Sequence, residues 1–185
     1  MSPQGERPSR FSDLKPPKVY RRVEEDPTMT PVRMLMADLV RDNLVQRKLG
    51  IYRLDTLLIR ETRLVSQLGQ AAIEKYLEAL RLLVPDSWDQ SQVVPVNQIT
   101  TDIRKGVGGR RVVIRLNHTD EILQERERAK AITLRMTGLE LPPFPHRLDI
   151  TLGKLKPVFD NDALQSRLDE IAPTQVTLLP TTIET

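Results

Sequence analysis

The sequence predicts an α+β fold in which helices pack against one antiparallel sheet. The first observation is that segments with helical spacing of apolar residues alternate along the chain with short β-type segments. The second is a strict period of two within residues 144–157, which is typical of a half-buried strand. There, Leu148, Ile150 and Leu152 share one face, and Asp149, Thr151 and Gly153 share the other. The acid, the hydroxyl and a glycine that permits close approach make the second face either a phosphate site or the ordinary polar side of a sheet.

The other elements follow in order along the chain. Helices are predicted over residues 28–48, 67–84, 119–137 and 161–171, and the third of these has Thr119 as its N-terminal cap and Gly138 as its stop. Strands are predicted over residues 51–59 and 175–179, a frayed end over 181–185, and a β-hairpin over 93–116. Residues 1–27 are rich in proline and charge and are predicted to be a flexible tail. Residues 28–185 then form a single domain, and the tail is a possible contact for a protein partner.

The composition excludes several kinds of chemistry. The 185 residues contain no cysteine and only two histidines, which excludes disulfides, thiolate catalysis and cysteine- or histidine-rich metal sites. A net charge of +3 is compatible with a polyanionic partner. The chain lacks an apolar run of the roughly 20 residues that span a bilayer and begins without a signal-peptide pattern, so we expect a cytoplasmic protein with no membrane partner.

The tip of the predicted hairpin carries three glycines and four cations. The cations are Arg104, Lys105, Arg110 and Arg111, and Lys154 follows at the end of the later strand. A glycine-rich basic turn can cradle phosphate through its backbone N–H groups, although the connection lacks the Walker pattern. Hairpin geometry alone also explains these glycines.

Two stretches of the chain are similar in sequence. The sequence YRLDTLLIRETRL begins at Tyr52, and HRLDITLGKLK begins at His146. Both place Arg-Leu-Asp before a threonine and a leucine on a predicted strand. Two such units facing each other would create a central cleft.

This order of elements resembles the 2H phosphoesterase superfamily, which includes 2′-5′ RNA ligase and RNA 2′,3′-cyclic phosphodiesterase proteins. The resemblance covers about residues 50–183 and rests on the glycine-rich hairpin, the following long helix and PPFPHRLDITLGKLKP. It implies a bilobal, two-layer sandwich with a groove between the lobes. It also implies one His-x-Thr or His-x-Ser strand per lobe, with two histidines as general acid and base and no need for a metal or cofactor.

Both family motifs lack their histidine in this chain. Asp149-Ile150-Thr151 stands at the second motif and Leu54-Asp55-Thr56 at the first, while His146 lies three residues before Asp149 and on the opposite strand face. By the resemblance, Thr56 and Thr151 contact phosphate. Asp149 or a displaced His146 is the remaining candidate for acid–base catalysis.

Three functions follow from this pattern. The first is a degenerate family member that binds RNA ends or nucleotide phosphates in the groove, with Lys154, Arg104, Lys105, Arg110 and Arg111 supplying positive charge. The second is an active RNA 2′,3′-cyclic phosphodiesterase that uses Asp149 or His146. The third is a non-catalytic interaction or scaffold module.

Overall fold

The fold was analysed in a computed structural model of the chain. The structure describes residues 18–46, 52–57, 62–83, 86–103, 110–138, 148–156 and 161–184. Three of the predicted site residues, Arg104, Lys105 and His146, lie outside these ranges.

Within the described ranges, seven strands form one antiparallel sheet in the order β2-β6-β5-β4-β7-β1-β3. The strands are β1 (Lys18–Val23), β2 (Val45–Gln46), β3 (Arg53–Leu57), β4 (Gln92–Ile103), β5 (Arg110–Leu116), β6 (Leu148–Leu155) and β7 (Gln175–Glu184). The predicted hairpin is the β4–β5 pair, and the strand predicted from the period of two is β6.

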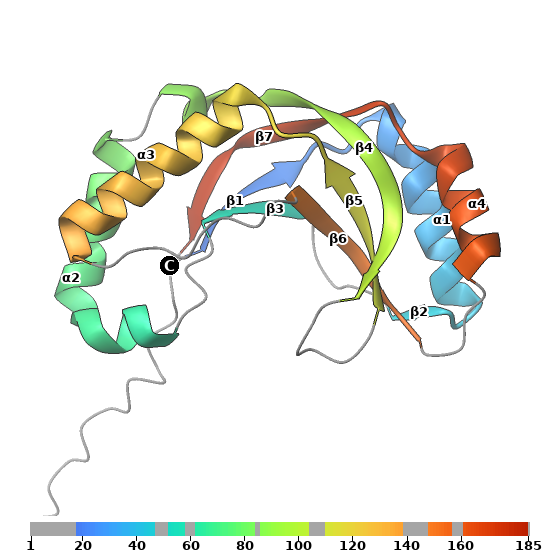
Figure 1. The fold of residues 1–185 in the computed structure, drawn as a ribbon, viewed down its shortest axis with the longest axis horizontal. Coiled ribbons are helices and arrows are strands. Elements are labelled where there is room, and N and C mark those ends of the chain that lie inside the picture. The colour runs from blue at the N-terminus through green and yellow to red at the C-terminus, as the bar shows by residue number, and fades with distance from the viewer. Residues whose placement is uncertain are drawn as a thin grey trace, which may run out of the picture.

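Helices flank this sheet on two sides (Figure 1). In that view α2 (Thr62–Leu83) and α3 (Asp120–Thr137) stand at one side of the arch of strands, and α1 (Thr30–Arg41) and α4 (Asn161–Ile171) stand at the other. Short 3-10 helices, η2 (Pro27–Met29) and η3 (Asp86–Asp89), precede α1 and β4. The predicted α+β class, with helices packed against one antiparallel sheet, is confirmed.

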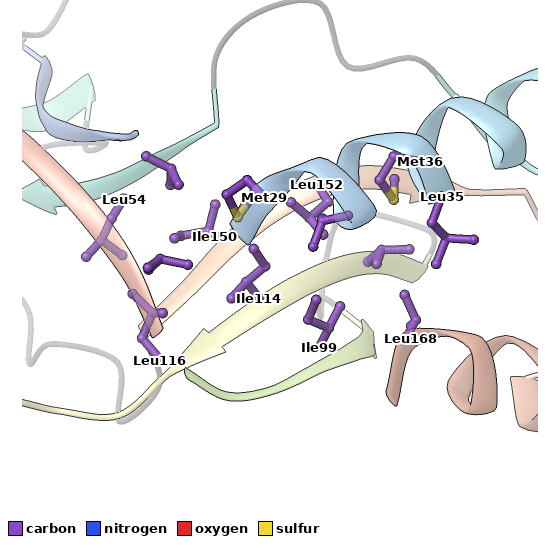
Figure 2. Packing of buried hydrophobic residues seen from close by; sticks show 14 of the residues in the cluster. Met29, Leu35, Met36, Leu54, Ile99, Ile114, Leu116, Ile150, Leu152 and Leu168 are labelled. Carbon is purple, nitrogen blue, oxygen red and sulfur yellow. The ribbon is translucent and has the colours of Figure 1, made fainter. Parts of the chain in front are cut away.

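The larger hydrophobic core lies between α1, α4 and the strands β4, β5 and β6. Figure 2 shows Met29 and Met36 from η2 and α1 packed over Ile150 and Leu152 of β6. Leu54 of β3 also belongs to this cluster, which therefore joins the two ends of the sheet. Each large apolar side chain buried in this way stabilises the fold by about 1.5–3 kcal/mol.

A second core lies between α2 and α3. It contains Tyr76 and Leu80 of α2, Ala129 and Ile132 of α3, and Val19 of β1. The predicted ends of α3 are confirmed: the Thr119 hydroxyl accepts a hydrogen bond from the Ile122 N–H, and Gly138 adopts the left-handed conformation with φ of 72°.

The predicted boundary of the flexible tail at residue 27 is wrong. Lys18–Val23 form β1, which pairs with both β7 and β3, and Val19 and Arg21 are each 0% exposed. The strand was missed because its apolar positions are interrupted by arginines, and its partners lie about 35 and 160 residues further along the chain. Only the tertiary fold supplies the buried acceptors that Arg21 requires.

Two other boundaries also differ from the prediction. The first helix ends at Arg41 rather than at residue 48, because Asn43 has a positive φ of 61° and the chain then enters β2. The last strand continues to Glu184, where a frayed end was predicted, because residues 181–184 pair with β1.

A β-bulge in β6 changes which residues share its polar face. Val112 pairs with Gly153 and Val113 pairs with Thr151, so Leu152 is the extra residue. The alternation therefore shifts by one position: Gly153 turns to the core, and Lys154 joins Asp149 and Thr151 on the opposite face. The group that approaches Gly153 closely is the Val45 side chain rather than a ligand, since a Cβ at Gly153 would lie 2.6 Å from Val45 Cγ1.

Among the described helices, none combines the length and the apolar character that crossing a membrane requires.

Candidate functional site

The candidate site lies on the face of β4, β5 and β6 opposite to the packed core. We call it the polar face and define it by six residues: Asp102, Arg111, Arg115, Asp149, Thr151 and Lys154. The strand register explains how they meet. Arg115 is the cross-strand partner of Asp149, and Arg111 is the partner of both Asp102 on β4 and Lys154 on β6. Directly opposed residues in a sheet have their side chains on the same face, so this register places the charges together.

Arg115 and Asp149 form a two-point ion pair at the centre of the polar face. Arg115 Nε donates to Asp149 Oδ1 at 3.0 Å, and Nη2 donates to Oδ2 at 3.2 Å. The side chains are 13% and 7% exposed, so the pair is largely shielded from water. The hydrogen bond to Asp149 raises the pKa of Arg115, burial opposes this, and the negative charges of Asp149 and Asp102 add to it.

Arg111 on β5 contacts side chains on both neighbouring strands, β4 and β6. Its Nη1 donates to Thr151 Oγ1 at 2.7 Å, and its Nη2 donates to Asp102 Oδ2 at 3.3 Å. The same Nη2 lies 3.7 Å from Asp149 Oδ2. Arg111 Nε is buried and has no hydrogen-bond partner within the described part of the chain. The threonine predicted to hold phosphate is thus already bound to an arginine of the next strand.

The charges on and beside the polar face leave a positive excess. Asp102 and Asp149 offset Arg111 and Arg115, while Lys154 and the neighbouring Arg110 are exposed to solvent. Arg110 alternates with Arg111 along β5 and so lies on the other face, which leaves three cations and two acids on the polar face and an excess of one positive charge. The arrangement can therefore attract an anion, although two carboxylates lie among the donors that the anion would use.

The first of the two similar stretches, which begins at Tyr52, also contains an arginine–aspartate ion pair, here on β3. Arg53 Nε lies 3.3 Å from Asp55 Oδ1, and the Arg53 guanidinium stacks at 4.7 Å over the ring of Tyr20. In both Arg-Leu-Asp segments the aspartate is therefore ion-paired with an arginine. β3 also contacts β6, which brings the two segments near one another. Thr56 lies in β3, but the position of its side chain is outside what the structure describes.

The structure thus brings Asp149, Thr151, Arg111 and Lys154 together, with Arg110 at the start of β5. It adds two residues that sequence reasoning missed, Arg115 and Asp102. A signal for Arg115 was present, since Arg111 and Arg115 are four residues apart in a predicted strand and so share one face. Asp102 had no comparable signal, because its place opposite Arg111 depends on the hairpin register.

The described residues offer a cavity away from the polar face but no metal site. They contain no group of three or more histidine, aspartate or glutamate side chains arranged to hold a metal ion. A cavity of about 500 Å³ lies beside α3 and η3, lined by Ser87, Glu121, Gln124, Glu125, Glu127, Arg128 and Ala131. It includes no residue of the polar face.

Comparison with known proteins gave a structural match but no sequence match. No protein-family model matches the chain, and no curated protein matches it in sequence. Among solved structures, the chain is similar to Usb1 of Kluyveromyces marxianus, with 9% identity and a TM-score of 0.49. The alignment covers 91% of this chain and 92% of that one.

Proposed function

We propose that this chain binds a phosphate group of an RNA end or a nucleotide on the polar face, without efficient turnover. The observation that carries the proposal is the position of Arg111. Its guanidinium lies between the Thr151 hydroxyl and the Asp102 carboxylate, directly opposite the exposed Lys154.

The chemistry of these groups suits a phosphate. Arginine presents planar N–H donors that match phosphate oxygens, and lysine adds a mobile point charge. Arg115 and Lys154 flank Arg111 along and across the strands, so an anion on this face would meet three cations. Arg104 and Lys105 extend the basic stretch in the sequence and are part of the proposal, as is phosphate contact by Thr56. Such a run of cations also suits the backbone of a nucleic acid.

The low turnover follows from the bonding of Asp149. A general base must accept a proton from the attacking group at hydrogen-bonding distance. Both oxygens of Asp149 already accept hydrogen bonds from Arg115. A carboxylate at this position would also repel a phosphate, whereas a neutral histidine would not.

Binding can be tested with a fluorescein-labelled RNA octamer that carries a 3′-phosphate, followed by anisotropy over a salt series. We expect affinity to fall with salt, and Lys154→Ala to weaken binding and reduce the salt slope by about one. Lys75→Ala is the matched control, because Lys75 is an exposed lysine on α2, away from the polar face. Binding that neither salt nor Lys154→Ala changes would contradict the proposal and favour a scaffold role.

Turnover can be tested by hydrolysis of a nucleoside 2′,3′-cyclic phosphate, followed by mass spectrometry. We expect no hydrolysis above background by the native chain. Hydrolysis that disappears in the Thr56→Ala/Thr151→Ala double variant would instead establish an active phosphodiesterase. Separate Asp149→Ala and His146→Ala variants would then identify the group that transfers the proton.

A further inference from the structure

The Asp149 carboxylate is bound in the way that a phosphate is commonly bound. Two parallel N–H···O bonds, of 3.0 and 3.2 Å, join one edge of the Arg115 guanidinium to the two oxygens of Asp149. Arginine forms the same two-point arrangement with carboxylates and with phosphates. A phosphate and the Asp149 side chain therefore require the same donors on Arg115.

Asp149 also lies close to a second arginine, Arg111. Its Oδ2 lies 3.7 Å from Arg111 Nη2, which in turn donates to Asp102 Oδ2. Asp102 Oδ2 is also 3.9 Å from Arg115 Nη2. Each arginine thus faces both carboxylates, and the positive charge that would attract a ligand is largely balanced before any ligand arrives.

We propose that Asp149 is a built-in competitor for the phosphate, occupying the guanidinium donors that a ligand on the polar face needs. The inference rests on the proposed phosphate-binding function and adds what limits it. A ligand phosphate binds only as Arg115 exchanges Asp149 for the phosphate, and Asp149 thereby lowers the affinity of the native site.

This role differs from a purely structural one in the direction of a measurable effect. If the pair served only to join β5 to β6, neutralising Asp149 would lower stability and leave anion affinity unchanged or reduced. If Asp149 competes with the ligand, neutralising it lowers stability and raises anion affinity. Stability and affinity therefore move in opposite directions under the proposal and not under a purely structural role.

The decisive variant is Asp149→Asn, which keeps the shape of the side chain and one acceptor but removes its charge. Asp38→Asn is the matched control, because it changes the net charge equally at a half-exposed position on α1. The probe is the same RNA octamer with a 3′-phosphate, and folding of each variant is checked by circular dichroism. We expect Asp149→Asn to bind about fivefold more tightly than the native chain, since a negative charge a few ångströms from the phosphate is removed. Asp38→Asn should differ from the native chain by less than about twofold.

Asp102→Asn provides a second route should Asp149→Asn fail to fold, because Asp102 is more exposed, at 22% against 7% for Asp149. We expect Asp102→Asn to raise the affinity for the RNA as well, but by less than Asp149→Asn does. If the native chain binds the RNA and both variants bind it equally well or more weakly, the competitor role is wrong and the proposed function stands. Binding by Asp149→Asn alone would support the competitor role and show that the native chain does not take up this RNA. No binding by any of the proteins would overturn both.

Discussion

The Nη2 atom of Arg21 lies 2.7 Å from Oε1 of Glu125, and the two side chains are 0% and 2% exposed. Arg21 also donates to the backbone carbonyls of Ser87, Gln90 and Leu179. One guanidinium on β1 therefore connects α3, the η3 region and β7. This buried charge fixes β1 within the domain, although the sequence predicts a flexible tail over these residues.

Glu125→Ala should strongly destabilise the protein. Removing the carboxylate leaves the Arg21 charge buried without its counter-ion, which typically costs about 3–5 kcal/mol. Urea unfolding followed by circular dichroism measures the change. Glu127→Ala is the control, because Glu127 lies two residues away on the same helix and is exposed. A loss at Glu125 no larger than that at Glu127 would contradict the importance of the pair.

Deletion of residues 1–27, over which the sequence predicts a flexible tail, should abolish cooperative unfolding. The deletion removes β1, which lies between β7 and β3 in the sheet and places Val19 in the second core. Thermal unfolding by calorimetry measures the result against the full-length chain. A deletion variant that keeps a sharp transition near the native midpoint would mean that β1 is dispensable.

Gly153→Ala should destabilise the edge of the sheet. The added Cβ would lie 2.6 Å from Val45 Cγ1 and 3.0 Å from Met36 Cε, and such overpacking typically costs about 1–3 kcal/mol. Chemical unfolding gives the size of the loss. The Gly153→Ala/Val45→Ala double variant tests the cause, because it frees the space that the new methyl group needs. The double variant should lose less stability than the two single losses added together, and simple additivity would argue against this contact.

The contribution of Tyr76 to stability should depend on pH in the alkaline range. Burial raises the pKa of Tyr76 to about 12, with the hydrogen bond to Thr133 as a smaller opposing cause. The folded protein then holds the phenol proton where the unfolded chain, with a pKa near 10, has lost it. This contribution is complete below pH 10 and is lost as the pH rises towards 12.

The comparison of native protein with Tyr76→Phe isolates this effect, because phenylalanine does not titrate. Between pH 10 and 12, the unfolding free energy of the native protein should fall relative to that of Tyr76→Phe by about 1.4 kcal/mol per pH unit. Parallel curves for the two proteins over this range would mean that the phenol ionises as easily in the folded state as in the unfolded one.

The sequence was informative where local chemistry decides structure. The Thr119 cap and Gly138 stop gave the ends of α3, because a hydroxyl at the first turn and a left-handed glycine at the last act within a few residues. The period of two in β6 gave the core face of Leu148, Ile150 and Leu152 and the opposite face of Asp149 and Thr151. Phosphate chemistry on that second face remains a prediction.

The tertiary structure decided the features that depend on distant partners. β1 could not be predicted from the sequence, because Arg21 and Arg22 interrupt its apolar positions. Its pairing with β7 and the ion pair of Arg21 with Glu125 exist only in the folded chain. The bulge at Leu152, set by pairing with β5, moved Gly153 to the core and Lys154 to the polar face. Away from that bulge, the sequence by itself determined which side chains share a face of β6, because the alternation is a property of the backbone. Only the fold decided that Asp149 meets Arg115, because the pairing register is set by the packing of whole faces rather than by any one residue.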